Sequence, residues 1–269
     1  MPTVALCSIC AMDRSLADAA ALAARCGADG FEVTARAPHL EASAGPDEVR
    51  TAGERIRASG LEVTAYGSYL SYTGPAYEAE AAREVERAAT LGTRLLRVWA
   101  GHPKGALDDI RHEVVAMLRA VGDAAAGEGI RVVVERHGGT LADSADRSEA
   151  LLDAVDHENV VLNYQPLDGL PPGEAADQPA DARRLIPRSH YFHVKNYRPN
   201  RTKSAPLLLG GDLETGVLDY HAILRAAVEA GYRGPYAIEF VAFDDRPLEA
   251  KVAAGIEWLR RTLAEVGAP

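Results

Sequence analysis

The sequence predicts an α/β protein that folds as a single closed (β/α)8 barrel, and three observations support this fold class. Strand-like apolar runs alternate with helix-like stretches along the whole chain, and eight units of each fit. No linker or change in composition divides the sequence. With 269 residues, the eight units average about 34 residues each, which agrees with the ~250 residues usual for such barrels. We therefore predict one domain over residues 1–269, a TIM barrel.

The expected strands are short runs rich in β-branched and aliphatic residues. They cover residues 4–9, 30–34, 61–66, 95–99, 131–135, 159–163, 190–194 and 235–240. Between them lie Ala-, Leu-, Glu- and Arg-rich stretches with helical periodicity, including residues 15–27, 81–92, 108–129 and 218–231. Several expected helices stop at a glycine, namely Gly27, Gly60, Gly92, Gly129 and Gly231, and Asp219 is a typical helix N-cap.

An open doubly wound sheet is the alternative architecture. It usually has a glycine-rich phosphate loop after its first strand, but residues 8–16 (SICAMDRSL) contain no glycine, which favours the barrel. Two long stretches without clear periodicity follow the sixth and seventh strands, at residues 165–180 and 196–216. We expect these stretches to form lids or substrate loops.

Composition and charge narrow the class of protein. The chain is 47% hydrophobic and 25% charged, with a formal net charge of −10, so it is not expected to bind nucleic acid or acidic membranes. The N-terminus does not have the pattern of a signal peptide, and no apolar stretch is long enough to span a bilayer. Three cysteines, Cys7, Cys10 and Cys26, indicate a reducing compartment, so we expect a cytoplasmic protein whose C-x-x-C thiols are packed in the first strand.

Four expected strands end in a residue that can bind a metal ion. These residues are Glu135, Asn163 or Gln165, His193 and Glu239, and successive candidates lie 28 to 46 residues apart, about one strand and one helix. In a barrel, the carboxyl ends of the strands meet at one mouth, where active sites lie. Because alternate side chains of a strand point inward, Glu135, His193 and Glu239 can face one another.

Two carboxylates, an imidazole and an amide oxygen suit Mn²⁺ best, with Mg²⁺, Co²⁺ or Zn²⁺ as alternatives. Such an ion can chelate a carbonyl and its neighbouring hydroxyl, acidify the C–H between them and hold the enediolate. Two glutamates on opposite sides of that carbon could remove and return the proton. An amide in place of a third carboxylate leaves no formal charge at the metal, which predicts a stronger Lewis acid that retains its metal less well.

Segments spread along the chain resemble the sugar phosphate isomerase/epimerase family of xylose-isomerase-like TIM barrels. They are AYGSYL (65–70), RVWAG (97–101), ERHGGTL (135–141), YQP (164–166), FHVKN (192–196) and IEFV (238–241). The resemblance implies that Glu135, His193, Glu239 and a residue of the sixth strand bind the metal, and that the two glutamates are the acid/base pair. Many relatives have an aspartate on this strand and a histidine three residues later, where this chain has Asn163 and Pro166. Members with a W-Q-P motif make Gln165 the expected fourth ligand.

Further side chains are expected to contact substrate near the mouth. They are Tyr66, Arg97, Trp99, His137, Asn163 and Lys195. Lys195 could bind a phosphate or carboxylate, or polarise a carbonyl. Glu32 on the second strand is expected in the barrel interior, where it would need an Arg or Lys partner.

The leading functional hypothesis is a divalent-metal-dependent isomerase or epimerase of a sugar, keto sugar or sugar phosphate. A dehydratase or lyase could use the same metal-held enediolate, and the residues do not separate these two classes. A sugar-binding barrel without catalysis is a third reading. A DNA-repair endonuclease would need more His and Asp ligands and a basic groove, which the chain lacks. The expected partner is a small carbohydrate, and the sequence leaves open whether the protein forms a homo-oligomer.

Overall fold

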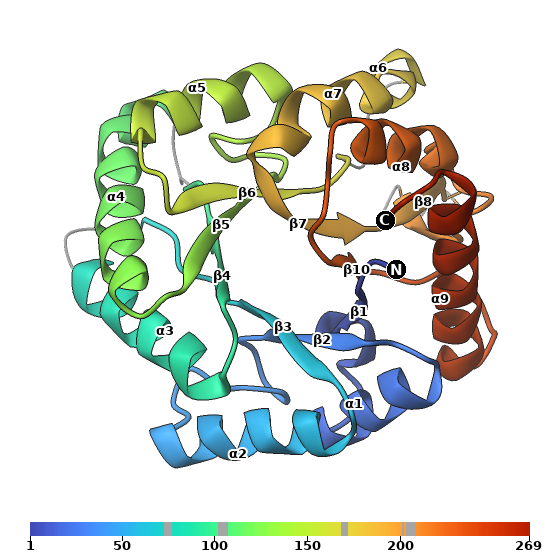
Figure 1. Cartoon of the computed structure of the whole chain (residues 1–269), viewed down its shortest axis with the longest axis horizontal. Coiled ribbons are helices and arrows are strands. Elements are labelled where there is room, and N and C mark those ends of the chain that lie inside the picture. The colour runs from blue at the N-terminus through green and yellow to red at the C-terminus, as the bar shows by residue number, and fades with distance from the viewer. Residues whose placement is uncertain (73–76, 102–106, 168–171, 201, 203–207) are drawn as a thin grey trace.

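The computed structural model describes the whole chain except residues 73–76, 102–106, 168–171, 201 and 203–207. Within the described residues, eight parallel strands close into a barrel in the order β1-β10-β7-β6-β5-β4-β3-β2, and helices surround it (Figure 1). The barrel strands are β1 (Val4–Cys7), β2 (Gly30–Thr34), β3 (Glu62–Gly67), β4 (Leu95–Trp99), β5 (Arg131–Glu135), β6 (Val160–Tyr164), β7 (Ser189–Val194) and β10 (Tyr236–Ile238). The predicted (β/α)8 fold is confirmed, and each predicted strand end lies within two residues of an observed one.

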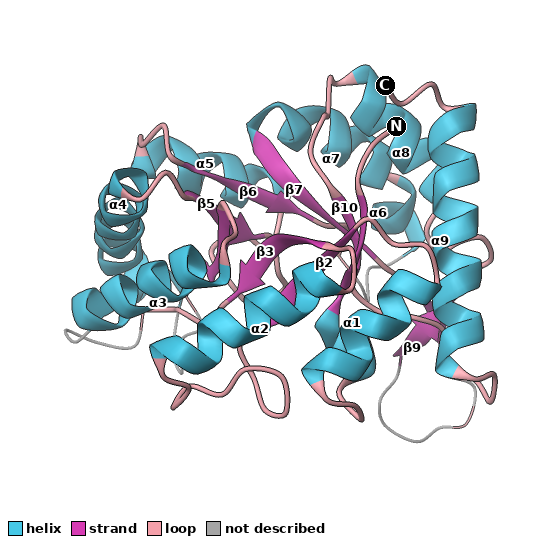
Figure 2. Cartoon of the chain, turned by 60° about the horizontal axis from the view of Figure 1, so that its bottom comes forward, coloured by secondary structure: helices cyan, strands magenta, loops and turns pink. Residues whose placement is uncertain are grey.

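The helices follow the strands and pack on the outside of the barrel (Figure 2). They are α1 (Leu16–Arg25), α2 (Pro46–Ala58), α3 (Tyr77–Leu91), α4 (Arg111–Gly127), α5 (Ala145–Val155), α6 (Pro172–Ala176), α7 (Gln178–Leu185), α8 (Tyr220–Glu229) and α9 (Leu248–Glu265), with 3-10 turns at η1 (Ser8–Ala11), η2 (Leu107–Ile110) and η3 (Ile186–Arg188). The five glycines predicted to end helices all have φ between 66° and 87°, a conformation that glycine adopts readily. The Asp219 side chain caps α8, as predicted, by accepting a hydrogen bond from the Ala222 N–H.

The two long irregular stretches contain more structure than the sequence predicted. The first includes α6 and the start of α7, and the second contains an antiparallel hairpin of β8 (Asn196–Pro199) and β9 (Leu208–Gly211). These elements are short, and β9 lacks the alternation of polar and apolar residues that marks a half-buried strand. The hairpin is held by the pairing of its two strands and by the Phe243 N–H, which donates to the Gly210 carbonyl, rather than by a local pattern.

Two groups of buried apolar side chains make up the core. The larger group lies between the strands and the surrounding helices. A separate small group, Ala5, Ala65, Val133, Tyr191 and Ala237, lies inside the barrel. The residues two positions further along these strands therefore also point inward, one layer closer to the carboxyl ends. This alternation determines which side chains form the site described next.

No helix in the described part of the chain is both long and apolar enough to cross a lipid bilayer.

Candidate metal and acid–base site

Polar side chains form the layer of the barrel interior that lies just above the small apolar group. Strand pairing sets their level: Glu135 on β5 pairs with Asn163 on β6, and Ala237 on β10 pairs with His193 on β7. Glu239 follows β10 directly, so it lies one layer above Ala237 on the same face. The strands therefore bring together side chains that are more than a hundred residues apart in the sequence.

Glu135, His193 and Glu239 converge as the sequence predicted. One ligand atom from each residue lies within 4.8 Å of those of the other two, and Glu239 Oε1 is 3.6 Å from His193 Nδ1. The three side chains are only 1%, 0% and 6% exposed, so water screens their charges poorly. Bonds of ~2.0–2.2 Å to one ion require little movement from these positions.

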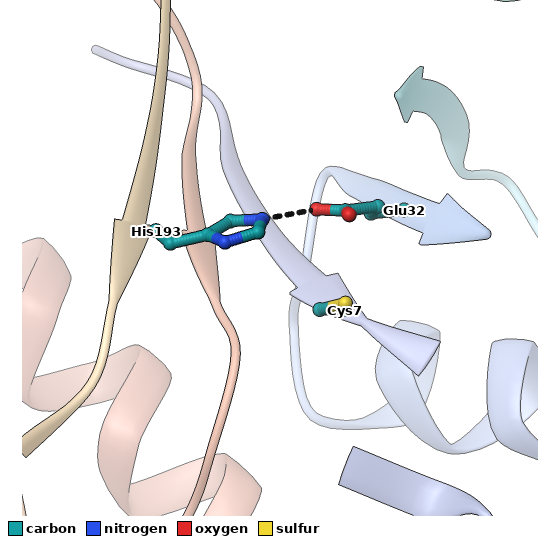
Figure 3. A group of neighbouring side chains, drawn as sticks. All are labelled: Cys7, Glu32 and His193. Carbon is teal, nitrogen blue, oxygen red and sulfur yellow. Dashed lines mark hydrogen bonds and ion pairs between the residues drawn. The ribbon is translucent and has the colours of Figure 1, made fainter. Parts of the chain in front are cut away.

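Glu32 on β2 fixes the orientation of the His193 ring. His193 Nε2 lies 2.7 Å from Glu32 Oε2, and both side chains are fully buried (Figure 3). If Nε2 carries the proton and donates it to this carboxylate, Nδ1 keeps its lone pair toward Glu239 and Asn163. A carboxylate behind a ligating histidine is the usual way to fix its tautomer. The Glu32 and Glu239 charges raise the pKa of His193 against the lowering effect of burial.

Arg97 on β4 joins Glu32 and Glu135. Its Nε donates to Glu32 Oε1 at 3.0 Å and its Nη1 donates to Glu135 Oε2. The expected basic partner of Glu32 is thereby confirmed. Burial alone would raise the pKa of Glu32, but the charges of His193 and Arg97 and their hydrogen bonds outweigh it and lower this pKa to about 2. Arg97 is 3% exposed and its guanidinium contacts these two carboxylates, so the expected contact between Arg97 and substrate stays a prediction.

Lys195, at the end of β7, contacts the other glutamate. Its Nζ lies 2.9 Å from Glu239 Oε2. Burial would raise the pKa of Glu239, but the Lys195, His193 and Arg97 charges lower it. Each of the two glutamates therefore has one oxygen beside a cation.

The two candidate amides differ in their contacts. Asn163 Nδ2 lies 3.1 Å from His193 Nδ1, beside the nitrogen that would bind a metal. Gln165 Nε2 instead donates to the Arg136 carbonyl at 2.5 Å and to Glu135 Oε1 at 3.2 Å. The side-chain oxygens of both amides are buried without a hydrogen-bond partner among the described residues. Such oxygens are costly to bury, and one of them beside two carboxylates and an imidazole fits a divalent cation in the centre.

Aromatic rings border the mouth above this group. The Trp99 and His137 rings stack with their centroids 4.5 Å apart, and Tyr69 lies 6.4 Å from Trp99. On the opposite side, Lys195 Nζ lies 5.4 Å from the centroid of the Phe240 ring. Trp99, His137 and Lys195 therefore lie at the mouth, where the sequence placed them. Phe240 was not singled out, although a bulky apolar residue directly after Glu239 was a usable signal.

Tyr66 does not face the site. Its hydroxyl donates to Glu84 of α3 at 2.6 Å and lies 3.4 Å from Arg87, on the outer side of the barrel wall. Gly67 is the inward position of β3, because a Cβ there would lie 2.5 Å from the Arg97 guanidinium and 2.6 Å from the Glu32 carboxylate. The expected contact between Tyr66 and substrate is therefore replaced by a structural bond to α3.

Replacing Tyr66 by Phe tests whether the Tyr66 hydroxyl stabilises the fold or contacts the substrate. We expect the variant to lose about 1.5 kcal/mol of unfolding free energy, because a buried hydrogen bond to a carboxylate is lost, and to keep full catalytic activity. Urea denaturation and a turnover assay on the same sample measure both quantities. A large loss of activity with unchanged stability would contradict the structural role.

The C-x-x-C segment lies beside the site, with Cys7 buried and Cys10 half-buried. Cys7 ends β1 and lies near Glu32 and His193 (Figure 3), while Cys10 Sγ lies 3.0 Å from the Glu239 carbonyl oxygen. Both thiols are free, and burial together with the neighbouring carboxylates raises their pKa values. They are therefore poor nucleophiles. Cys7 lies in the first strand as predicted, whereas Cys10 lies in η1.

Comparison with protein-family models matches residues 20–262 to the xylose isomerase-like TIM barrel family. The chain belongs to this family. A curated relative, the 3-dehydroshikimate dehydratase of Bacillus anthracis, is 30% identical over 148 residues, which cover 49% of this chain and 51% of the relative. The chain thus matches about half the length of that protein. The family fits both epimerases and dehydratases.

Solved structures of similar proteins agree over the full barrel. A xylose isomerase-like TIM barrel protein from Mycobacterium smegmatis in complex with magnesium has a TM-score of 0.77 and 18% identity, covering 100% of this chain and 98% of that one. An L-ribulose 3-epimerase has a TM-score of 0.77 and 18% identity, covering 99% and 96%. At these identities the likeness establishes the shared fold.

Proposed function

We propose that this family member is a divalent-metal-dependent isomerase or epimerase of a sugar, keto sugar or sugar phosphate. The observation that carries the proposal is the convergence of Glu135, His193 and Glu239 within 4.8 Å, next to an amide oxygen that has no hydrogen-bond partner in the described part of the chain. Three buried carboxylates, those of Glu32, Glu135 and Glu239, lie beside Arg97 and Lys195, and His193 lies between Glu32 and Glu239. A divalent cation would offset the remaining negative charge.

Mn²⁺ suits this donor set best, with Mg²⁺, Co²⁺ and Zn²⁺ as alternatives. When bound, the ion would act as a Lewis acid toward a substrate carbonyl and its neighbouring hydroxyl. Glu135, His193 Nδ1 and Glu239 would hold it. Asn163 is the better fourth ligand, because its side-chain amide lies against His193 Nδ1 and would present Oδ1 there after a half-turn, while Gln165 is bonded to the Arg136 backbone.

Glu135 and Glu239 are arranged to move the proton. They come from β5 and β10, which β6 and β7 separate in the barrel, so they approach a bound carbon from different sides. One glutamate would remove the proton beside the carbonyl, and the other would deliver a proton to the resulting enediolate. Arg97 contacts Glu135 and Lys195 contacts Glu239, so these cations would orient the two carboxylates. Trp99 and His137 would exclude water from one side of the substrate.

Solvent exchange tests this function directly. The protein is stripped of metal with a chelator, reloaded with Mn²⁺, and incubated in deuterium oxide with a panel of keto sugars and their phosphates. We expect deuterium at C2 or C3 of at least one substrate, with loss of exchange on stripping and recovery on reloading. No metal-dependent exchange with any member of the panel would contradict the proposal.

Dehydration is the second candidate, favoured by the similarity to the 3-dehydroshikimate dehydratase. The same glutamate would remove the proton, and a group near the other carboxylate would protonate a departing hydroxyl. Lys195, which contacts Glu239, is placed to assist that step. Mass spectrometry of the products distinguishes the two reactions, because dehydration removes one water molecule and isomerisation leaves the mass unchanged.

A further inference from the structure

A second group of side chains lies on the other side of the His193 ring. Cys7 at the end of β1 pairs with Glu32 on β2, and Cys7 follows Ala5 of the small apolar group by two positions, so both side chains project into the barrel. One ligand atom from each of Cys7, Glu32 and His193 lies within 4.8 Å of those of the other two (Figure 3). The described residues therefore contain two groups that could bind a metal ion, and the groups meet at one histidine.

The two groups use opposite nitrogens of this ring. Nδ1 of His193 lies 3.6 Å from Glu239 Oε1, whereas Nε2 lies 2.7 Å from Glu32 Oε2. Glu32 binds Arg97 through its other oxygen, Oε1, so Oε2 is the oxygen that an ion could take. An ion with bonds of ~2.0–2.2 Å to Nε2 and Oε2 requires these atoms to move apart by roughly 0.5 Å, and it would replace the proton between them.

The donors of this group differ from those of the candidate site. A thiolate is a soft ligand, and together with an imidazole and one carboxylate it favours Zn²⁺ over Mn²⁺ or Mg²⁺. Cys7, Glu32 and His193 are at most 1% exposed, so water competes poorly for an ion held between them. On binding, Cys7 would lose its thiol proton and the ring its Nε2 proton, and both protons would leave to solvent.

We propose that Cys7, Glu32 and His193 Nε2 form a second metal site, selective for a soft ion such as Zn²⁺. Charge decides whether both sites fill together. The Cys7 thiolate and the three buried glutamates balance Arg97, Lys195 and one divalent ion, and a second ion would leave a surplus of positive charge in a buried place. Zn²⁺ in this site therefore excludes Mn²⁺ from the candidate site. The Zn²⁺ site goes beyond the proposed function, and only this competition rests on it.

X-ray absorption at the zinc edge identifies the ligands directly. The metal-free full chain is loaded with one equivalent of Zn²⁺. We expect one sulfur ligand at ~2.3 Å, with nitrogen and oxygen ligands at ~2.0–2.2 Å. Failure to bind Zn²⁺, or Zn²⁺ bound by nitrogen and oxygen alone, would overturn the proposal.

Cysteine variants locate the sulfur. Cys7→Ser should remove the sulfur signal and weaken Zn²⁺ binding about ten-fold or more, and Cys7→Ala gives the same test if the serine variant does not fold. Cys26→Ser is the matched control, since this half-buried thiol contacts the Glu249 backbone instead. Cys10→Ser should also keep the sulfur ligand, because Cys10 does not belong to the group. A sulfur ligand that persists in Cys7→Ser would overturn the proposal.

Competition with Mn²⁺ tests the shared use of His193. Electron paramagnetic resonance of free Mn²⁺ measures how much of this ion Zn²⁺ releases from the Mn²⁺-loaded protein. We expect one equivalent of Zn²⁺ to bind with its sulfur ligand and to release most of the Mn²⁺. Sulfur-bound Zn²⁺ with the Mn²⁺ retained would overturn the predicted exclusion. Sulfur-bound Zn²⁺ in a protein that binds no Mn²⁺ and shows no exchange activity would instead contradict only the proposed function.

Discussion

Replacing Glu239 or Glu135 by Gln is expected to lower metal-dependent proton exchange by about 10³-fold or more, because general acid–base catalysis contributes ~10²–10⁴-fold. Gln keeps the shape of each side chain but cannot accept the proton. It also removes a charge from the proposed metal site, so metal affinity should fall in both variants. Exchange rates at saturating Mn²⁺ separate the loss of the base from the loss of the metal.

The control for these variants is Glu265→Gln, since this side chain is 52% exposed at the end of α9. It should leave exchange unchanged. Circular dichroism of each protein confirms that the fold persists. Activity within ten-fold of the parent in both Glu135→Gln and Glu239→Gln would exclude the two glutamates as the acid/base pair and favour a barrel that binds sugars without catalysis.

Replacing Arg97 by Met is expected to cost about 3–5 kcal/mol of unfolding free energy. The guanidinium is the cation that joins Glu32 and Glu135, and its removal leaves two carboxylates buried at 0% and 1% exposure. Urea denaturation at neutral pH measures the loss. Mn²⁺ should restore part of the stability, because a bound cation would replace the lost charge beside Glu135.

Two comparisons test the cause of this loss. Glu32→Gln added to Arg97→Met should recover part of the stability, since one uncompensated carboxylate is then removed. Arg25→Met breaks an exposed ion pair with Glu249 and should leave stability nearly unchanged, because solvent screens such a pair. A loss below ~1 kcal/mol in Arg97→Met would show that the buried ion pairs do not hold this layer of the barrel together.

Most of the barrel could be predicted because each strand carries its own signal. The runs around Glu135, His193 and Glu239 are apolar, short and followed by polar residues at the strand end. Closure of the barrel then brings these ends together without further information from the sequence. The convergence of the three side chains therefore follows from a regular pattern of local segments.

The direction of Tyr66 could not be predicted in the same way. The pairing of β2 with β3 shifts register between Phe31 and Glu32, so that Phe31 pairs with Val63 but Glu32 pairs with Ala65. A one-residue shift reverses which side chains face inward. No local pattern marks this irregularity, and Tyr66 consequently faces α3 while Gly67 faces the site.

Contacts between side chains of different strands could not be predicted from the sequence either. The sequence predicted that Glu32 needs a basic partner. It could not show that this partner is Arg97, or that Glu32 also contacts His193, because both contacts depend on closure of the barrel. The preference between Asn163 and Gln165 has the same origin, since both amides share a strand face and only the surrounding contacts distinguish them. The position of the β8–β9 hairpin depends in turn on its contacts with the segment after β10.

A crystal structure of the protein grown with Mn²⁺, with anomalous diffraction recorded at the manganese absorption edge, tests the central claim most directly. The proposal requires one strong anomalous peak bound by Glu135, Glu239 and His193 Nδ1, with an Asn163 or Gln165 oxygen as a fourth protein ligand. An anomalous peak at another place would contradict the proposal. So would crystals grown with Mn²⁺ that show no peak between Glu135 and Glu239, with Arg97 and Lys195 still bonded to these glutamates.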